Sequence, residues 1–321
     1  MRIGANPEKK KGIRLHYKKH RVIIPVYIPD VEDAYFMNLF NVFKISMESL
    51  LETISTETLV TIINNDCKNE VSDYINKLLD EKKIDKHIKL AKNYGKVYTA
   101  VAEARASYED YITIADADVF YFSNWENEVF KIFNTFKYAG VVAPLPAPHG
   151  ALYNNVSLFG KVYNQAKMGN VVDPKSFELF EKGTNNPNIF QDRKHKWKEK
   201  QYYLEKSGIK ACVGSGHFVA TYKNVFKSFP DLKPEHVFRV GDVELFLDVQ
   251  FDKLGYYRLS SLKANVYHLG NTIPDWIKKI NIKQKEISIL IQKPIKLPSQ
   301  FKGKYYFKKL LFKFLKKYKL I

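Results

Sequence analysis

The sequence contains few cysteines and no long apolar run, and each shortage excludes a class of protein. Cys67 and Cys212 are the only thiols in 321 residues, and neither has a His or Cys partner at metal-binding spacing. A zinc–thiolate site and a disulfide-rich secreted scaffold are therefore excluded, whereas two lone thiols suit a reducing cytosol and leave one disulfide open. The sequence has no run of about 18 apolar residues, and its basic N-terminus lacks the apolar core of a signal peptide. We therefore expect neither export by that route nor a transmembrane helix.

Acidic residues are nearly absent from the two ends of the chain. Residues 1–21 hold eight Lys or Arg and one acid, and residues 301–321 hold eight Lys and no acid. The ends thus supply +15 of the formal net charge of +18, and residues 22–300 supply only +3. A nucleic-acid-binding domain carries its basic surface on the folded body. The charge at the ends instead predicts tails that contact an anionic surface, and we expect no nucleic-acid partner.

Strand-like and helix-like patterns alternate up to residue 116. The pattern predicts strands at 22–29, 59–64, 87–90 and in the run that ends at 116, and helices at 34–53, 70–81 and 97–107. This alternation is typical of an α/β fold with a mostly parallel sheet and flanking helices. Residues 144–200 lose the rhythm and are rich in Pro and Asn, which predicts long loops with short helices, a usual place for ligand recognition.

Two carboxylates, Asp116 and Asp118, end the fourth predicted strand. In open α/β sheets, ligands bind beyond the carboxyl ends of the strands. Two like charges there repel each other unless a cation lies beside them. Mg²⁺ or Mn²⁺ bound to substrate phosphates would neutralise them, because such ions take oxygen ligands. The alternative is a turn that ends the strand with two solvated carboxylates.

Four segments, in order along the chain, resemble those of the GT-A glycosyltransferases, most closely the inverting family often called family 2. Residues 21–27 (RVIIPVY) are similar to the opening strand V-S-I-I-I-P-x-Y, and residues 59–67 stand where the family has I-I-V-V-D-D-G-S. The third segment runs from Asn93 to Asp118. The fourth comprises residues 213–220, 240–247, 255–258 and 266–270.

The resemblance implies a GT-A fold over residues 21–280, with a nucleotide half at about 21–143 and an acceptor half at about 144–280. Residues 1–20 would form a basic tail and 281–321 a membrane-associating extension. The implied activity is transfer of a sugar from a nucleotide-sugar donor to a glycan or lipid-linked acceptor, with inversion and with Mn²⁺ or Mg²⁺. Synthesis of cell-envelope polysaccharide or glycolipid would place the protein in the cytoplasm, on the inner face of the membrane.

The resemblance also assigns residues to the donor. Asp118 would bind the metal directly, and Asp116 would contact the ribose or the metal's waters. His268 would complete the metal site or touch the diphosphate, although a His in an apolar run is also a common packed strand residue. The remaining donor contacts would be Pro25, Tyr27, Asn64, Asn65, Asp66, Gly95 and Lys96.

Two of these donor assignments have plain structural alternatives. Asn64 and Asn65 replace the family's carboxylates, which leaves the nucleotide contact and an Asn-rich turn equally open. Gly95 and Lys96 open a helix, where phosphate binding and simple capping are both reasonable.

The acceptor side follows from the fourth segment. Asp242 best matches the family's catalytic base and Glu244 is the reserve, because the family's adjacent acidic pair is split here by Val243. Acids also favour the first turn of a helix for electrostatic reasons, which is the structural alternative. Gly214, Gly216, His217 and Phe218 would form the floor of the donor-sugar and acceptor pocket, where glycine lets the backbone approach a ligand.

Residues 301–321 are predicted to form an amphipathic helix. At about 100° per residue, one face collects Phe307, Leu310, Phe314 and Tyr318, and most lysines fall on the other, while Phe312 departs from this pattern. Such a helix lies at an anionic membrane surface. The alternative is a helix that packs on the body with solvated lysines.

Two other functions remain open from the sequence. A sugar nucleotidyltransferase shares the α/β body and the metal carboxylates, but residues 241–248 and His268 favour sugar transfer. A non-enzymatic membrane or nucleic-acid adaptor would explain the basic ends but not the carboxylates at the strand end. Retention of anomeric configuration is also open, since a fold does not fix the function.

Overall fold

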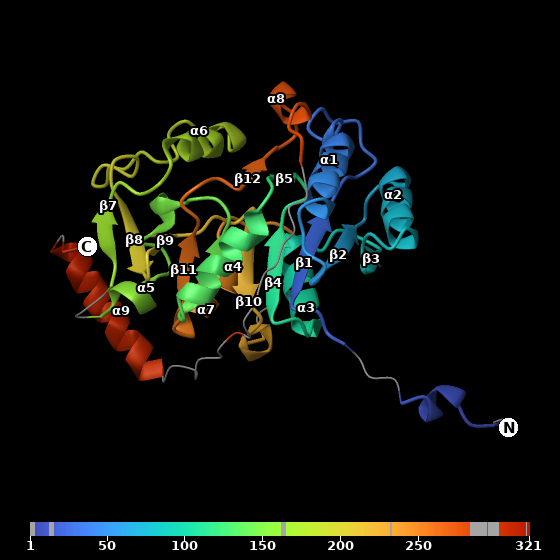
Figure 1. Ribbon diagram of the computed structural model, residues 1–321, viewed down its shortest axis with the longest axis horizontal. Coiled ribbons are helices and arrows are strands. Elements are labelled where there is room, and N and C mark those ends of the chain that lie inside the picture. Colours follow the sequence, from blue (N-terminus) through green and yellow to red (C-terminus); the bar gives the residue numbers. More distant parts are fainter. Residues whose placement is uncertain are drawn as a thin grey trace.

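The computed structural model describes residues 4–12, 16–161, 165–231, 233–282, 294, 302–318 and 320–321. It contains a large mixed sheet with helices on both faces (Figure 1). In spatial order the strands are β3 (Lys86–Leu90), β2 (Thr58–Asn65), β1 (His20–Val26), β4 (Tyr111–Ala115), β10 (Val219–Lys223), β6 (Ala139–Ala143), β11 (Tyr257–Ser260), β9 (Ile209–Val213), β8 (Gln201–Lys206) and β7 (Lys167–Gly169). A separate antiparallel pair joins β5 (Val119–Tyr121) to β12 (Val266–His268).

The described helices vary widely in length. The α-helices are α1 (Leu39–Leu51), α2 (Asn69–Asp80), α3 (Lys96–Ala106), α4 (Trp125–Thr135), α5 (Val156–Phe159), α6 (Pro174–Gly183), α7 (Val249–Lys253), α8 (Asp275–Lys278) and α9 (Lys302–Lys317). Short 3₁₀ turns lie at Pro7–Lys10, Pro148–Gly150 and Phe226–Ser228, and a π-helical turn at Glu244–Asp248 leads directly into α7.

The first half of the chain folds as its periodicity predicts. β3, β2, β1 and β4 are all parallel, and α1, α2 and α3 connect them. β1 is buried along its whole length, and its side chains alternate between the two layers of core: Val22 and Ile24 on one face, Ile23 on the other. The predicted α/β class is confirmed. The helix predicted at 34–53 is shorter, because residues 35–38 form a turn before α1.

The second half continues the sheet with strands of both directions. β10 runs antiparallel to β4 and to β6, β11 is parallel to β6, and β9, β8 and β7 follow as antiparallel neighbours. The described part of residues 144–200 contains short elements joined by loops, as predicted. The two predicted halves therefore share one sheet, with β10 at the junction.

Parallel strands place their carboxyl ends at one edge of the sheet. β4 ends there at Ala115, and β5, β12 and α6 lie at that same end (upper part of Figure 1). Asp118, which follows β4, and His268, which ends β12, therefore lie at the same edge although they are far apart in the chain. This edge is where the candidate site forms.

The two cysteines are buried and free, so no disulfide joins them. Cys67 donates to the carbonyl oxygen of Val26 at 3.2 Å, and its sulfur accepts from the Ile28 amide. Burial raises the pKa of Cys67 to about 11. Both thiols are packing residues.

The C-terminal helix α9 lies against the body beside α5 (Figure 1). Phe312, which departs from the predicted apolar face, is 9% exposed and packs on Phe159, and the hydroxyl of Tyr305 donates to Asp252 at 3.0 Å. The helix itself is confirmed for 302–317, whereas Phe301 lies outside the described residues. Within the part of the chain that the structure describes, no helix has the length and apolar character needed to cross a bilayer.

We predict that Gly140 in β6 tolerates no side chain. A Cβ there would lie 2.3 Å from the Cβ of Tyr256 and 3.0 Å from the ring of Phe251. Overpacking of this kind costs about 1–3 kcal/mol, so Gly140→Ala should lower the free energy of unfolding in urea by that amount. Gly150→Ala is the matched control, because its nearest neighbour would lie at 3.6 Å. Equal stability of the two variants would contradict this packing.

Candidate active site

The candidate site is built on the two carboxylates that follow β4. The Asp116 amide donates to the carbonyl oxygen of Phe218 at 2.7 Å, and its carboxylate forms a short ion pair with Lys96. Burial raises the pKa of Asp116, and the Lys96 charge opposes that rise. Lys96 also donates to the carbonyl oxygen of His217 at 3.0 Å, so one ammonium group joins the strand end to the 214–218 loop.

His268 comes to Asp118 from β12. Its Nε2 lies 3.4 Å from Oδ2 of Asp118, and its Nδ1 lies 2.8 Å from the carbonyl oxygen of Gly183, the last residue of α6. Burial lowers the pKa of His268, but the bond and charge of Asp118 outweigh it and bring the pKa to about 9. A Cβ at Gly183 would lie 2.8 Å from the carbonyl oxygen of His268, so glycine permits the close approach.

These residues fit a divalent metal ion. One ligand atom each from Asp116, Asp118 and His268 lies within 4.8 Å of the others. Oδ1 of Asp118 is buried and has no hydrogen-bond partner among the described residues, which is costly unless a cation takes its lone pairs. Two carboxylates and an imidazole suit Mn²⁺ or Mg²⁺ rather than a thiolate-seeking metal. The Gly183 carbonyl would hold the Nδ1 proton and leave Nε2 as the ligand.

A cavity of about 570 Å³ opens over these residues. Aromatic side chains line its other wall: Tyr27, directly after β1, packs edge to face on Phe36 of the turn before α1 at 6.0 Å, and Tyr35 lies beside Phe36. Tyr27 is 39% exposed, so its ring is available to a ligand. With a divalent ion on the carboxylates, this cavity would suit a ligand that has both anionic groups and a flat ring.

The structure brings together only some of the predicted donor residues. Tyr27, Asp116, Asp118 and His268 line the cavity, and Lys96 contacts Asp116. Pro25 does not line it, because its ring is buried within β1 opposite Ile63.

Asn64 and Asn65 are also buried, and their amides have protein partners. Asn64 bonds Ser72 and the Cys67 amide, and Asn65 accepts from the Tyr94 amide at 3.0 Å. These contacts are those of the turn-forming alternative, and the nucleotide contact of Asn64 and Asn65 stays a prediction. Asp66 is exposed and has a left-handed φ of 68°.

Gly95 precedes α3 with a φ of 81°, in the left-handed region that favours glycine. A Cβ at Gly95 would lie 2.0 Å from the carbonyl oxygen of Val237, so the chain around Val237 covers this helix start. Val237 therefore partly covers the N-terminus of α3. The side chain of Lys96, the first residue of this helix, still reaches the carboxylate of Asp116.

The predicted pocket floor lies next to the carboxylates. Phe218 packs between Phe180 and His268, with ring centroids 5.4 and 4.9 Å away. Gly214 has a φ of 111° and passes under the carbonyl oxygen of Ala147, where a Cβ would lie at 2.3 Å. A Cβ at Gly216 would make ordinary contacts, the nearest at 3.8 Å from the ring of Phe218.

The predicted base residues lie on the first turns of the helical segment that begins at 242. Asp242 is half-buried and Glu244 is exposed. Neither lines the cavity over Asp116 and Asp118. Their role stays a prediction.

A buried charge cluster escaped sequence reasoning. Asp248 lies 2.8 Å from a guanidinium nitrogen of Arg258 and 3.0 Å from Nε2 of His217, and Asp248 and Arg258 are each about 1% exposed. Burial raises the pKa of Asp248 to about 7, against the opposing charge of Arg258, and burial lowers the pKa of His217 to about 3. The only sequence signal was Asp248 four positions after Glu244.

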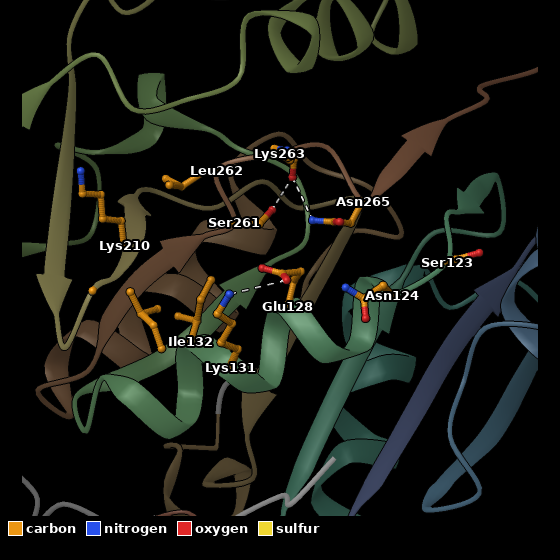
Figure 2. A pocket seen from close by; sticks show the side chains of 12 residues that line it. Ser123, Asn124, Glu128, Lys131, Ile132, Lys210, Ser261, Leu262, Lys263 and Asn265 are labelled. Carbon is orange, nitrogen blue, oxygen red and sulfur yellow. Dashed lines mark hydrogen bonds and ion pairs between the residues drawn. The ribbon is translucent and has the colours of Figure 1, made fainter. Parts of the chain in front are cut away.

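A second cavity of about 510 Å³ lies away from these residues (Figure 2). It is lined by polar and lysine side chains of α4, the β8–β9 turn and the 261–265 loop. Lys131 pairs with Glu128, and both Ser261 and Asn265 donate to the Lys263 carbonyl oxygen. Its polar groups largely satisfy one another, and none of the residues that the sequence singled out lies in it.

Comparisons of the sequence with protein-family models and with curated proteins find no match. Among solved structures, S. aureus TarS 1–349 in complex with UDP-GlcNAc is similar at a TM-score of 0.44 and 11% identity, over 82% of this chain and 62% of that one. The mannosyltransferase PcManGT from Pyrobaculum calidifontis, in complex with GDP-Man and Mn²⁺, is similar at a TM-score of 0.34 and 13% identity, over 41% of this chain and 37% of that one.

These neighbours are glycosyltransferases, and this chain spans less than two thirds of the length of either. Likeness at this level does not establish a shared activity. The site described above therefore carries the functional argument.

We predict that Asp118 is needed for metal binding. Asp118→Asn keeps the shape of the side chain and removes the charge that faces His268. We expect Mn²⁺ affinity, measured by electron paramagnetic resonance, to fall by at least about 100-fold, the upper range for removing a supporting residue. Asp66→Asn, an exposed acid after the neighbouring strand, is the control and should bind Mn²⁺ as wild type does. Unchanged affinity in Asp118→Asn would remove the metal assignment.

Proposed function

We propose that this protein is a metal-dependent glycosyltransferase of the inverting family 2 type. It transfers a sugar from a nucleotide-sugar donor to a glycan or lipid-linked acceptor in the synthesis of cell-envelope polysaccharide or glycolipid. The observation that carries this proposal is the Asp116–Asp118–His268 group at the carboxyl edge of the parallel strands, next to an aromatic-lined cavity. The ordered sequence segments that resemble GT-A enzymes support it.

The residues divide into clear roles under this proposal. Asp118 and His268 hold the metal, and Asp116 contacts its waters or the ribose. Tyr27 offers an aromatic face to the base, and Lys96 exchanges Asp116 for a phosphate oxygen as the donor enters. A bound divalent ion supplies Lewis-acid stabilisation of the leaving nucleoside diphosphate. Because Lys96 also contacts the His217 carbonyl, its movement links donor entry to the pocket floor.

Asp242 is the proposed general base that removes the proton from the attacking hydroxyl of the acceptor. Glu244 is the alternative base. Asp242 is half-buried and precedes the π-helical turn, so its carboxylate is open to a ligand and lies close in sequence to the buried Asp248. The hydroxyl oxygen attacks the anomeric carbon, the bond from that carbon to the phosphate oxygen breaks, and Asp242 takes the proton.

We predict nucleotide release from one of a small set of donors. Purified protein with Mn²⁺ is incubated with UDP-, GDP-, CMP- and dTDP-sugars, and the free nucleotide is measured. We expect slow hydrolysis of one class, and its loss in EDTA. In the same assay, Asp242→Asn should lose about 100-fold or more in rate, the scale typical of a removed general base, yet keep nucleotide binding.

The outcomes separate the alternatives. Synthesis of a nucleotide-sugar from a sugar phosphate and a nucleoside triphosphate would establish the nucleotidyltransferase instead. Full turnover in EDTA would reject metal dependence. A crippled Glu244→Gln beside an active Asp242→Asn would move the base by two residues.

We further propose that α9 holds the protein on the inner face of an anionic membrane from the cytoplasmic side. Its body-facing side is fixed by Phe312 and Tyr305, and the opposite side exposes Tyr306, Phe307 and Leu310, followed by Phe314 and Tyr318. Lysines flank this face, and Lys304, Lys309 and Lys313 are exposed. An aromatic face with lysine flanks suits an anionic lipid surface.

We predict that the outward face of α9 determines vesicle binding. The double variant Leu310→Ser and Phe314→Ser should weaken binding to vesicles of phosphatidylglycerol and phosphatidylcholine by at least about tenfold, since each buried apolar side chain contributes about 1.5–3 kcal/mol. Phe238→Ser, which removes an 84% exposed aromatic ring elsewhere, is the matched control. Sedimentation with vesicles at two salt concentrations separates the electrostatic contribution of the lysines from the hydrophobic contribution of the apolar face.

Point variants are preferable to truncation before α9, because deletion would uncover the surface that Phe312 covers on α5. Binding that survives the double variant would reject α9 as the anchor. Binding to duplex DNA in place of vesicles would favour the adaptor.

A further inference from the structure

A groove of about 690 Å³ lies outside the carboxylate cavity. One wall is the outward face of α3, and the other is the segment 233–237 together with Phe246. Neither the metal group nor the proposed roles above use this groove. It is larger than the cavity over Asp116 and Asp118.

The chain from 229 to 237 touches α3 at both ends of the groove. At one end the Arg105 guanidinium donates to the carbonyl oxygen of Pro230 at 2.6 Å and lies 3.6 Å from Asp231. At the other end the Val237 carbonyl oxygen occupies the space that a side chain at Gly95 would need. The groove is therefore bounded at both ends by defined contacts.

The groove has an aromatic floor. Tyr94 and Tyr98 lie with ring centroids 6.0 Å apart and an interplanar angle of 35°, and they are 40% and 48% exposed. Phe246 adds a buried aromatic ring. Partly exposed, mutually tilted rings offer flat apolar faces with a hydroxyl at the edge.

The rim of the groove carries both signs of charge. Lys92, Lys233 and Arg105 alternate with Asp231 and Glu235. A polyanion would meet the two acids, and an acyl chain would offer no hydrogen bond to any of these charged groups, of which Arg105 and Asp231 already pair with each other. An uncharged ligand with many hydroxyl groups and apolar ring faces satisfies both the floor and the rim. Carbohydrate has that chemistry.

One end of the groove lies next to the candidate active site along the chain. Tyr94 in its floor precedes Gly95 and Lys96, and Lys96 pairs with Asp116. The opposite wall continues from Val237 to Asp242, the proposed base. We propose that this groove binds the acceptor carbohydrate and directs its reacting end between Lys96 and Asp242. This inference rests on the proposed function for the meaning of "acceptor", but not for carbohydrate binding itself.

The test uses full-length protein and two tyrosine variants. Fluorescently labelled protein is applied to an array of neutral and charged oligosaccharides, and the best binder is titrated by calorimetry. We expect a neutral oligosaccharide to bind, and Tyr98→Ala to weaken its binding by roughly two- to tenfold, because the variant loses one aromatic contact. Tyr108→Ala, an exposed tyrosine that does not line the groove, should bind as wild type does.

Nucleotide binding is measured in parallel with UDP and GDP in the presence of Mn²⁺. Tyr98→Ala should leave it unchanged. A protein that binds nucleotide but no array carbohydrate, or binds one equally well in wild type and Tyr98→Ala, would overturn the groove assignment and leave the proposed function standing. Carbohydrate binding that depends on Tyr98 without any nucleotide binding would support the groove and overturn the proposed function. Binding of charged glycans alone would also overturn the assignment.

Discussion

The structure depends on two like charges held at the end of one buried strand. β4 is buried at every position, and it delivers Asp116 and Asp118 to the edge of the sheet without solvent on one side. Their mutual repulsion has to be balanced by cationic groups that come from distant parts of the chain. Lys96 reaches Asp116 from the start of α3, and His268 reaches Asp118 from β12. The pairing of β12 with β5 sets His268 opposite Val119 and so brings its imidazole next to Asp118.

The register of β10 explains why the pocket floor lies beside those carboxylates. β10 runs antiparallel to β4 with Val219 opposite Ala115, so the residue before Val219 stands next to the residue after Ala115. The hydrogen bond from the Asp116 amide to the Phe218 carbonyl oxygen is the consequence. A shift of one residue would turn every side chain of β10 to the other face, and the 214–218 loop would no longer meet Lys96. One backbone register thus brings the 214–218 loop to the carboxylates.

Sequence reasoning recovered what depends on local pattern and missed what depends on tertiary contacts. The four parallel strands and three helices of the first half followed from periodicity, and the Asp-x-Asp at the end of β4 followed from its place after an apolar run. Asn64 and Asn65 show the opposite case: strand-end position suggested ligand contact, but Ser72 and Tyr94, which only folding brings near, take up their amides. Asp248 and Arg258 are ten positions apart, a spacing that does not predict their buried ion pair. Phe312 departs from the amphipathic pattern because it packs against Phe159 of the folded body, a contact that a helical wheel does not contain.

The segment from Asp242 to Lys253 connects three features that the sequence presented as separate. Asp242 is at its start, Asp248 in its middle holds Arg258 and His217, and Asp252 near its end accepts from the Ser157 amide at 2.7 Å and from Tyr305 of α9. Asp252 is fully buried, so this contact is not a loose surface bond but part of the packing between α7, α5 and α9. Through Asp252, α9 is therefore packed on a helical segment that also carries the proposed base. If α9 rests on a membrane, the same packing fixes the angle at which the proposed acceptor groove, whose wall includes Phe246 of that segment, faces the lipid surface. Anchoring and acceptor binding would then be properties of one rigid element, because the buried carboxylates along it leave little freedom for either end to move alone.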